Sequence, residues 1–171
     1  MLLSHPVQLV DSAPGVSLAL AGAKCQSSEV EAIGTDGEVV TVHGADRTLT
    51  YRPRRVTVSD GSFVMHESRG GTLSSVWATD LGDRFVEVVH LGDGPVGGEL
   101  VLVVPDADTV AIGELYAPSL VTNGLHPTWP AAVDLAVGLT TASTRILSVE
   151  GPIERDELES FHQHLLRVLH G

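Results

Sequence analysis

Short strand-like segments separated by turn residues fill most of the chain, and this pattern most constrains how it can fold. The segments are rich in Val, Thr, Leu and aromatic residues, with Gly, Asp or Pro between them. Glu99–Val104 is almost wholly apolar, which predicts a strand buried on both faces. Asp36-Gly37 lies between two such runs and predicts a tight hairpin turn. The predicted strands cover residues 16–21, 39–43, 48–51, 55–58, 62–66, 74–78, 84–90, 99–104, 109–113 and 145–149.

Two helices are predicted, both in the second half of the chain. The first begins after Thr128, an N-cap residue type, and has Pro130 in its first turn, where the missing N–H is tolerated. The second covers about residues 154–170, with acidic residues crowding its N-terminus and Arg167 near its end, as the helix dipole favours. Strands with these two helices predict the α+β class. The apolar faces are predicted to contain Trp129, Ala132, Val133, Ala136 and Leu139 in the first helix, and Leu158, Phe161, Leu165 and Leu169 in the second.

Length and composition predict one globular domain over residues 1–171, with a β-rich N-terminal half (1–84) and a second half (85–171). No apolar run is long enough to span a bilayer, and the N-terminus lacks the basic and apolar regions of a secretory signal. A single cysteine, Cys25, excludes an internal disulfide and a multi-cysteine zinc site. We therefore expect a cytoplasmic protein.

The charge of the chain narrows the classes of partner. The formal net charge is −12, and residues 86–171 carry −9 of it. Such an acidic surface repels phosphate backbones and anionic lipid, so nucleic-acid binding and membrane-surface binding are not expected.

An ordered series of five features in the second half resembles the C-terminal half of the metallo-β-lactamase-fold hydrolases. That family has a strand, a loop G-P-x-H-T-x-G-D, an apolar strand, a P-D turn, an apolar strand ending in G-D-L, a helix, a P-G-H-G-P segment and an acidic-headed terminal helix. The matching segments here are Phe85–Leu100, Val101–Leu115, Trp129 with its helix, Ile146–Pro152 and the terminal helix. The resemblance implies a β-rich αβ/βα sandwich, truncated here, with few helices in its N-terminal half.

The metal ligands of that family are largely missing from this sequence. Pro95 replaces the loop histidine, Glu114 replaces the aspartate of G-D, and Glu150 replaces the histidine of P-G-H-G. No H-x-H-x-D-H occurs, and the nearest echo begins at His43. A hydrolytic dinuclear site needs neutral imidazoles and an open position for hydroxide. The resemblance therefore implies that the family's hydrolysis is absent and that no metal cofactor is bound, with Glu114, Glu150 and His90 as weak candidate ligands.

By the resemblance, the rim of the old active-site cleft would form a remodelled polar pocket for a small molecule or a single cation. The alternative is that these side chains are only solvated or hydrogen-bonded rim residues. Glu114 either lines a cleft or pairs with an arginine such as Arg145, because a buried carboxylate needs a partner. The candidate pocket residues are His90, Asp93, Glu114, His126 and Glu150.

Two further groups of residues receive structural interpretations. His162 and His164 lie two residues apart on a helix, so their rings point to opposite faces and do not chelate a metal together. Arg52, Arg54 and Arg55 form a basic spot, interpreted as a solvated strand face or as a dock for an acidic surface, including the chain's own acidic half.

The expected function is that of a non-catalytic metallo-β-lactamase-like protein, a pseudoenzyme that acts as a binding or assembly module for a small ligand or a protein. The alternative is a hydrolase with a reduced single-metal site built from carboxylates, holding one divalent ion. Because the N-terminal sheet lacks helical cover, its outer face must be polar or covered by another chain. The alternation within Val39–Tyr51 makes one face modestly apolar, so a homodimer through this half is expected.

Overall fold

The computed structural model describes residues 9–10, 17–18, 30–32, 39–65, 76–123 and 125–171. The predicted Asp36-Gly37 turn and the surroundings of Cys25 lie outside these residues. Near the N-terminus, β1 (Leu9–Val10) pairs antiparallel with β2 (Ser17–Leu18). Among the described residues, no helix combines the length and the apolar character needed to cross a bilayer.

The first sheet has five strands that are neighbours in chain order, every pair antiparallel. Short turns connect β4 to β5 and β5 to β6, as the Gly, Asp and Pro residues between the predicted strands indicate. The strands are β3 (Val30–Ala32), β4 (Val40–His43), β5 (Thr48–Arg52), β6 (Arg55–Val58) and β7 (Phe63–Met65).

The second sheet has six strands in the order β13-β12-β11-β10-β9-β8. Its pairs are antiparallel except for β11 and β12, which are parallel. The connection from β11 to β12 contains a 3₁₀ segment, η2 (Pro118–Asn123), and the first helix. A second 3₁₀ segment, η1 (Pro105–Ala107), links β10 to β11. The strands are β8 (Val76–Asp80), β9 (Phe85–Asp93), β10 (Gly98–Val104), β11 (Thr109–Gly113), β12 (Arg145–Ser148) and β13 (Gly151–Ile153).

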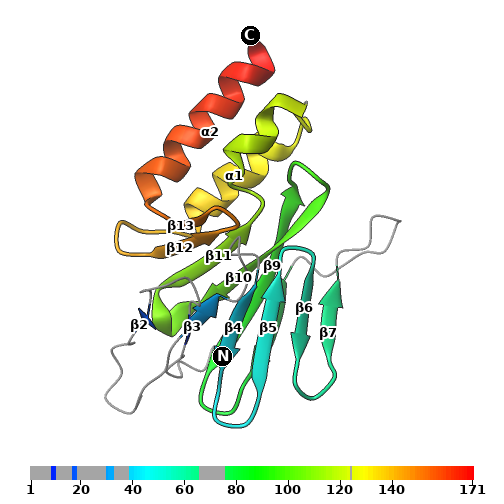
Figure 1. The fold of residues 1–171 in the computed structure, drawn as a ribbon, viewed down its shortest axis with the longest axis vertical. Helices are drawn as coiled ribbons and strands as arrows, with labels where there is room; N and C mark the ends of the chain where they lie inside the picture. The colour runs from blue at the N-terminus through cyan, green and yellow to red at the C-terminus, as the bar shows by residue number, and fades with distance from the viewer. Residues whose placement is uncertain (1–8, 11–16, 19–29, 33–38, 66–75, 124) are drawn as a thin grey trace.

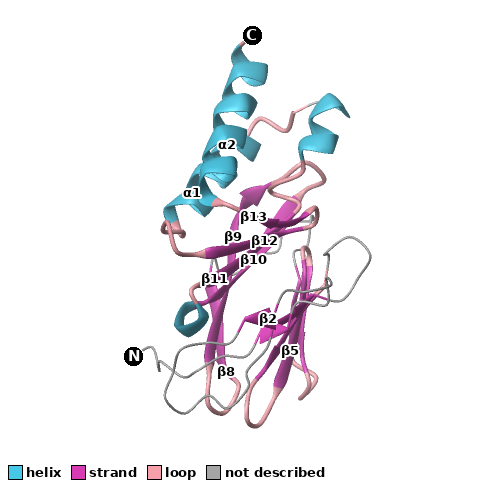
Figure 2. Ribbon diagram, turned by 60° about the vertical axis from the view of Figure 1, so that its left-hand side comes forward, coloured by secondary structure: helices cyan, strands magenta, loops and turns pink. Residues whose placement is uncertain are grey.

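The two sheets face each other, and two helices, α1 (Trp129–Gly138) and α2 (Arg155–His170), pack on the other face of the second sheet (Figures 1 and 2). Strand β10 lies in the middle of this arrangement. Leu100 and Leu102 are buried between the sheets, whereas Val101 is buried under the helices. The α+β prediction and the prediction that this strand is buried on both faces are therefore confirmed.

The first sheet presents its apolar side chains to the second sheet. Val40, Val42, Leu49 and Tyr51 belong to the core between the sheets and are at most 1% exposed. The other face carries threonines, with Thr50 opposite both Thr41 and Thr57 in the strand register. On this face Thr41 is buried, Thr50 and Thr57 are half-buried, and Phe63, opposite Thr57, is exposed, whereas the apolar residues of β4 and β5 are covered by the second sheet. The homodimer therefore stays a prediction, and the apolar residues of Val39–Tyr51 give no reason for it.

Both helices form at the predicted positions, with local differences. Thr128 is the N-cap residue of α1, but its side chain makes no capping hydrogen bond. Leu139 and Leu169, predicted on the apolar faces, are each 38% exposed. Leu139 follows the last residue of α1, and Leu169 lies in the last turn of α2, which projects past the sheets (Figure 1).

Backbone contacts join the two sheets at both ends of the sandwich. At one end, the β4–β5 turn approaches the β8–β9 turn, and the amides of Asp46 and Arg47 donate to the Leu81 carbonyl at 2.9 and 3.1 Å. At the other end, the Leu100 amide of β10 donates to the Pro53 carbonyl of the β5–β6 turn at 2.6 Å. We call this second contact the Pro53–Leu100 joint. The candidate pocket residues lie near it.

Candidate functional site

Four of the five predicted pocket residues lie at one edge of the second sheet, the edge formed by the C-terminal ends of β9, β11 and β12. Strand β9 ends there at Asp93, and Glu114 directly follows the end of β11. Glu150 lies in the turn after β12, which ends at the same edge because β12 runs parallel to β11. His126 precedes α1 and reaches Asp93. His90 lies further inside β9, opposite Leu100 of β10.

Asp93 and His126 are brought together. Nε2 of His126 lies 3.7 Å from Oδ2 of Asp93, and Nδ1 of His126 lies 2.9 Å from the Thr128 hydroxyl. Both side chains are more than one-third exposed. This is a solvated contact at the start of α1, and water screens its electrostatic energy.

Glu114 pairs with Arg54 of the β5–β6 turn. An Arg54 guanidinium nitrogen lies 3.4 and 3.5 Å from the two Glu114 carboxylate oxygens. The prediction that Glu114 pairs with an arginine is confirmed, but the suggested arginine is wrong. Arg145 lies opposite Thr109, at the other end of β11. One arginine of the predicted basic spot thus contacts the chain's own acidic half.

Glu150 binds a neighbouring loop. Its carboxylate accepts hydrogen bonds from the Ser119 hydroxyl at 2.9 Å and from the Ser119 amide at 3.4 Å. Four of the five predicted residues therefore belong to separate local contacts, Asp93 with His126, Glu114 with Arg54 and Glu150 with Ser119. They share one edge of the sheet, yet each pair is a separate contact.

Glu99 is the residue at this edge whose importance the sequence did not reveal. Its side chain is fully buried at the start of β10, beside a register shift between β9 and β10. Burial, and after it the neighbouring Glu114 carboxylate, raise the pKa of Glu99 to about 8 against the lowering effect of Arg54. The run Glu99–Val104 indicated burial of this position, but a single polar residue at a strand end carries no signal of its partners.

Gly94 packs closely against the Glu99 side chain, and Gly113 packs closely against Tyr51. The Tyr51 hydroxyl donates to the Leu100 carbonyl at 2.7 Å. Burial raises the Tyr51 pKa well above its ordinary value, and Glu99 and Glu114 act in the same direction. A Cβ on Gly94 would lie 2.6 Å from Cγ of Glu99, and one on Gly113 would lie 2.7 Å from the Tyr51 hydroxyl. Both glycines are therefore needed for close packing.

The residues at this edge do not fit the two-metal site of the family that the second half resembles. Pro95 offers no donor, Glu114 faces a guanidinium, and Glu150 is held by Ser119. His43, the nearest echo of the family's histidine motif, lies at the β4–β5 end of the sandwich, where Nδ1 of His43 is 3.3 Å from the Thr48 hydroxyl. Among the residues that the structure describes, no three His, Cys, Asp or Glu side chains are grouped as a metal site would require.

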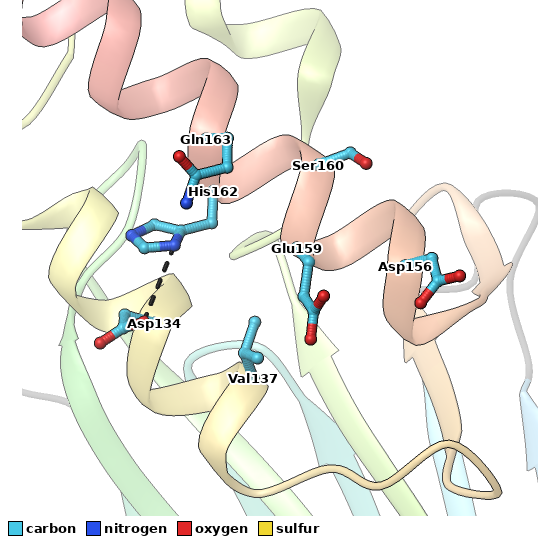
Figure 3. A pocket seen from close by; sticks show the side chains of 7 residues that line it. All are labelled: Asp134, Val137, Asp156, Glu159, Ser160, His162 and Gln163. Atoms are coloured by element: carbon cyan, nitrogen blue, oxygen red, sulfur yellow. Dashed lines mark ion pairs between the residues drawn. The ribbon is translucent and has the colours of Figure 1, made fainter.

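A separate hollow of about 600 Å³ lies between α1 and α2 (Figure 3). Nδ1 of His162 lies 3.7 Å from Asp134 across it. His164 lines a different hollow, beside Tyr116 and Phe161, so the prediction that the two histidines face different sides is confirmed. The α1–α2 groove is lined by Asp134, Val137, Asp156, Glu159, Ser160, His162 and Gln163.

Comparison with known proteins identifies no relative. No protein-family model matches the chain, and no curated protein is significantly similar to it.

Proposed function

We propose that this chain is a non-catalytic protein of metallo-β-lactamase-like architecture that acts as a binding or assembly module. Two facing sheets with helices on one outer face, and the order of strands and helices in the second half, support this proposal. The absence of helices on the threonine face of the first sheet is compatible with a truncated version of that architecture, within the described residues.

The pairing of Glu114 with Arg54 is the observation that carries the non-catalytic part of the proposal. Glu114 stands where the resembling family has a metal-binding aspartate. Here the positive charge beside it is a guanidinium from the other sheet, 3.4 Å away. Arginine stays protonated and has no lone pair to offer a metal, so it competes with a cation for the carboxylate without helping to bind one.

Metal content tests this part of the proposal. Protein purified without chelator or affinity metal, and then incubated with zinc, iron or manganese, should contain far less than one equivalent by elemental analysis. Arg54→Ala, which removes the competing charge, should bind more metal than the wild type, whereas the exposed neighbour Arg52→Ala should not. Near-stoichiometric metal in the wild type would overturn the proposal in favour of the single-metal hydrolase and would justify screening esters, thioesters and lactams.

The binding part of the proposal is assigned to the α1–α2 groove. Three carboxylates, those of Asp134, Asp156 and Glu159, line the groove around the Val137 side chain. Arg155 pairs with Glu159, leaving the lining acidic overall. A peptide rich in lysine fits such a lining. Its ammonium groups complement the carboxylates, and the methylene groups of its side chains cover Val137.

Titration with a lysine-rich peptide, followed by amide NMR, tests the groove as the binding surface. The Val137 and Gln163 amides should shift, and Asp134→Lys should weaken the apparent affinity about tenfold, as the loss of one well-placed charge contact does. Asp46→Lys makes the same charge change on an exposed residue at the β4–β5 turn and serves as the matched control. Equal weakening by both variants would show that net charge, and not the groove, attracts the peptide.

A further inference from the structure

The Glu99 carboxyl group is enclosed where the two sheets meet, beside the Pro53–Leu100 joint. Its residue is 0% exposed. The next residue, Leu100, makes both backbone contacts to the first sheet: its amide donates to Pro53, and its carbonyl accepts from Tyr51. The β9–β10 loop packs against the Glu99 side chain, since a Cβ on Gly94 would overlap its Cγ. A change at this carboxyl group therefore acts directly on the joint and on the loop.

The charged and titratable groups that face Glu99 come from different elements. Glu114, after β11, contributes a second negative charge, and Arg54, from the β5–β6 turn, contributes the positive charge. The Tyr51 hydroxyl of β5 lies close enough to be affected by both carboxyl groups. Asp93 is one step away, opposite Gly98 in the register, and is paired with His126. The positive charge of Arg54 therefore acts on both the Glu99 and the Glu114 carboxyl groups.

We propose that Glu99 is a proton-dependent latch, whose ionisation frees the β9–β10 loop (residues 94–97) from the Glu99 side chain and the start of β10 from the β5–β6 turn. When Glu99 is neutral, Arg54 needs to balance only Glu114. When Glu99 is ionised, a second buried carboxylate lies beside the first, and the arrangement is costly unless the new charge reaches water.

The loop is built to move at little conformational cost. Gly92 and Gly97 have positive φ of 127°, and the Gly94 amide donates to the Gly97 carbonyl at 2.7 Å, which closes the loop internally. The loop can therefore swing as a unit about its glycines while keeping its own turn. In the open form Glu99 would be solvated, and the Leu100 amide would lose its bond to Pro53.

Hydrogen exchange of the Leu100 amide measures this opening. The carboxyl group has its ordinary pKa of about 4.3 when solvated and a raised pKa of about 8 when enclosed. The protection factor of Leu100, after division by the intrinsic exchange rate, should fall up to about tenfold per pH unit between pH ~5 and ~8 and then level off. The Ile112 amide, in the buried strand β11, should remain better protected than Leu100 throughout.

Three variants separate the latch from other titrations. Glu99→Gln should make the Leu100 protection factor nearly independent of pH. Asp106→Asn removes another buried carboxyl group with a raised pKa and should leave the difference between Leu100 and Ile112 as it is in the wild type. Glu114→Gln keeps Glu99 but removes the like charge, so the levelling-off should occur at lower pH.

Two results would overturn the latch. One is equal protection of Leu100 and Ile112 at every pH, which would mean that the joint opens only when the whole protein unfolds. The other is an unchanged pH dependence at Leu100 in Glu99→Gln. If Glu99→Gln fails to fold, Glu114→Gln still decides the question. Without the like charge the enclosed Glu99 ionises more easily, so the fall in Leu100 protection must be smaller and must level off at lower pH, and an unchanged profile overturns the latch.

Discussion

Glu99 destabilises the folded protein at neutral pH because its carboxyl group is enclosed. Its pKa is about 8 when folded and about 4.3 in an unfolded chain. Between these values the unfolded chain loses a proton that the folded protein keeps, so the stability falls as the pH rises through this window. Below pH ~4 both states hold the proton, and the effect disappears.

We therefore expect Glu99→Gln to raise the free energy of unfolding at pH ~8 by roughly 2–4 kcal/mol, and to leave it nearly unchanged at pH ~4. Urea denaturation at both pH values measures this. The pKa of Asp106 is raised to about 7, mainly by burial, so Asp106 also makes the free energy of unfolding fall as the pH rises. Asp106→Asn measures that separate contribution. A Glu99→Gln protein that loses stability with pH as steeply as the wild type would contradict the assignment.

At the scale of single residues, the sequence could predict that Glu114 needs a positively charged partner, but not which residue that partner is. A carboxylate directly after an apolar strand indicates a pairing requirement. The partner, Arg54, lies 60 residues earlier in the chain, in a turn of the other sheet. Only the stacking of the two sheets brings these residues together, and no local pattern encodes that stacking.

At the scale of elements, α2 begins with a capping box made by two glutamates. The Glu154 side chain accepts from the backbone of Glu157, and Glu157 in turn accepts from the Glu154 amide at 2.9 Å. These contacts satisfy two donors that helix geometry leaves free and place negative charge at the positive end of the helix dipole.

Glu157→Ala should lower the free energy of unfolding by about 1 kcal/mol, because it removes half of the capping box. Glu159→Ala removes a carboxylate from the same helix that makes only an i, i+4 pair with Arg155, and should cost about 0.3 kcal/mol. Thermal denaturation of both variants gives the comparison. Equal losses would indicate that the box contributes no more than an ordinary surface ion pair.

Elements with a clear pattern were predictable, and those without one were not. Alternating or continuous apolar residues marked β4, β5, β6, β10 and β11, and helical spacing marked α1 and α2. Strand β13, Gly151-Pro152-Ile153, shows no alternation of apolar and polar residues, and only Ile153 has a high propensity for strands. It exists because it pairs with β12 at the edge of the sheet, a tertiary cause that a three-residue segment does not display.

At the scale of the whole molecule, the second sheet is the shared wall of two cores. The first core lies between the sheets, and the second lies under the helices. The sequence predicted this asymmetry, since both helices belong to the second half of the chain. It did not predict that the apolar face of the first sheet is satisfied internally, because alternation alone does not say which neighbour covers a face.

The single parallel pair in the second sheet has a consequence for the order of folding. Neighbouring antiparallel strands from β8 to β11 are joined by short connections and can pair locally. Strand β12 can join β11 only after the chain from Glu114 to Thr144, including α1, has crossed over the sheet, and closing such a long loop costs more entropy. We therefore expect β12, β13 and α2 to be added last, onto a sandwich that has already formed.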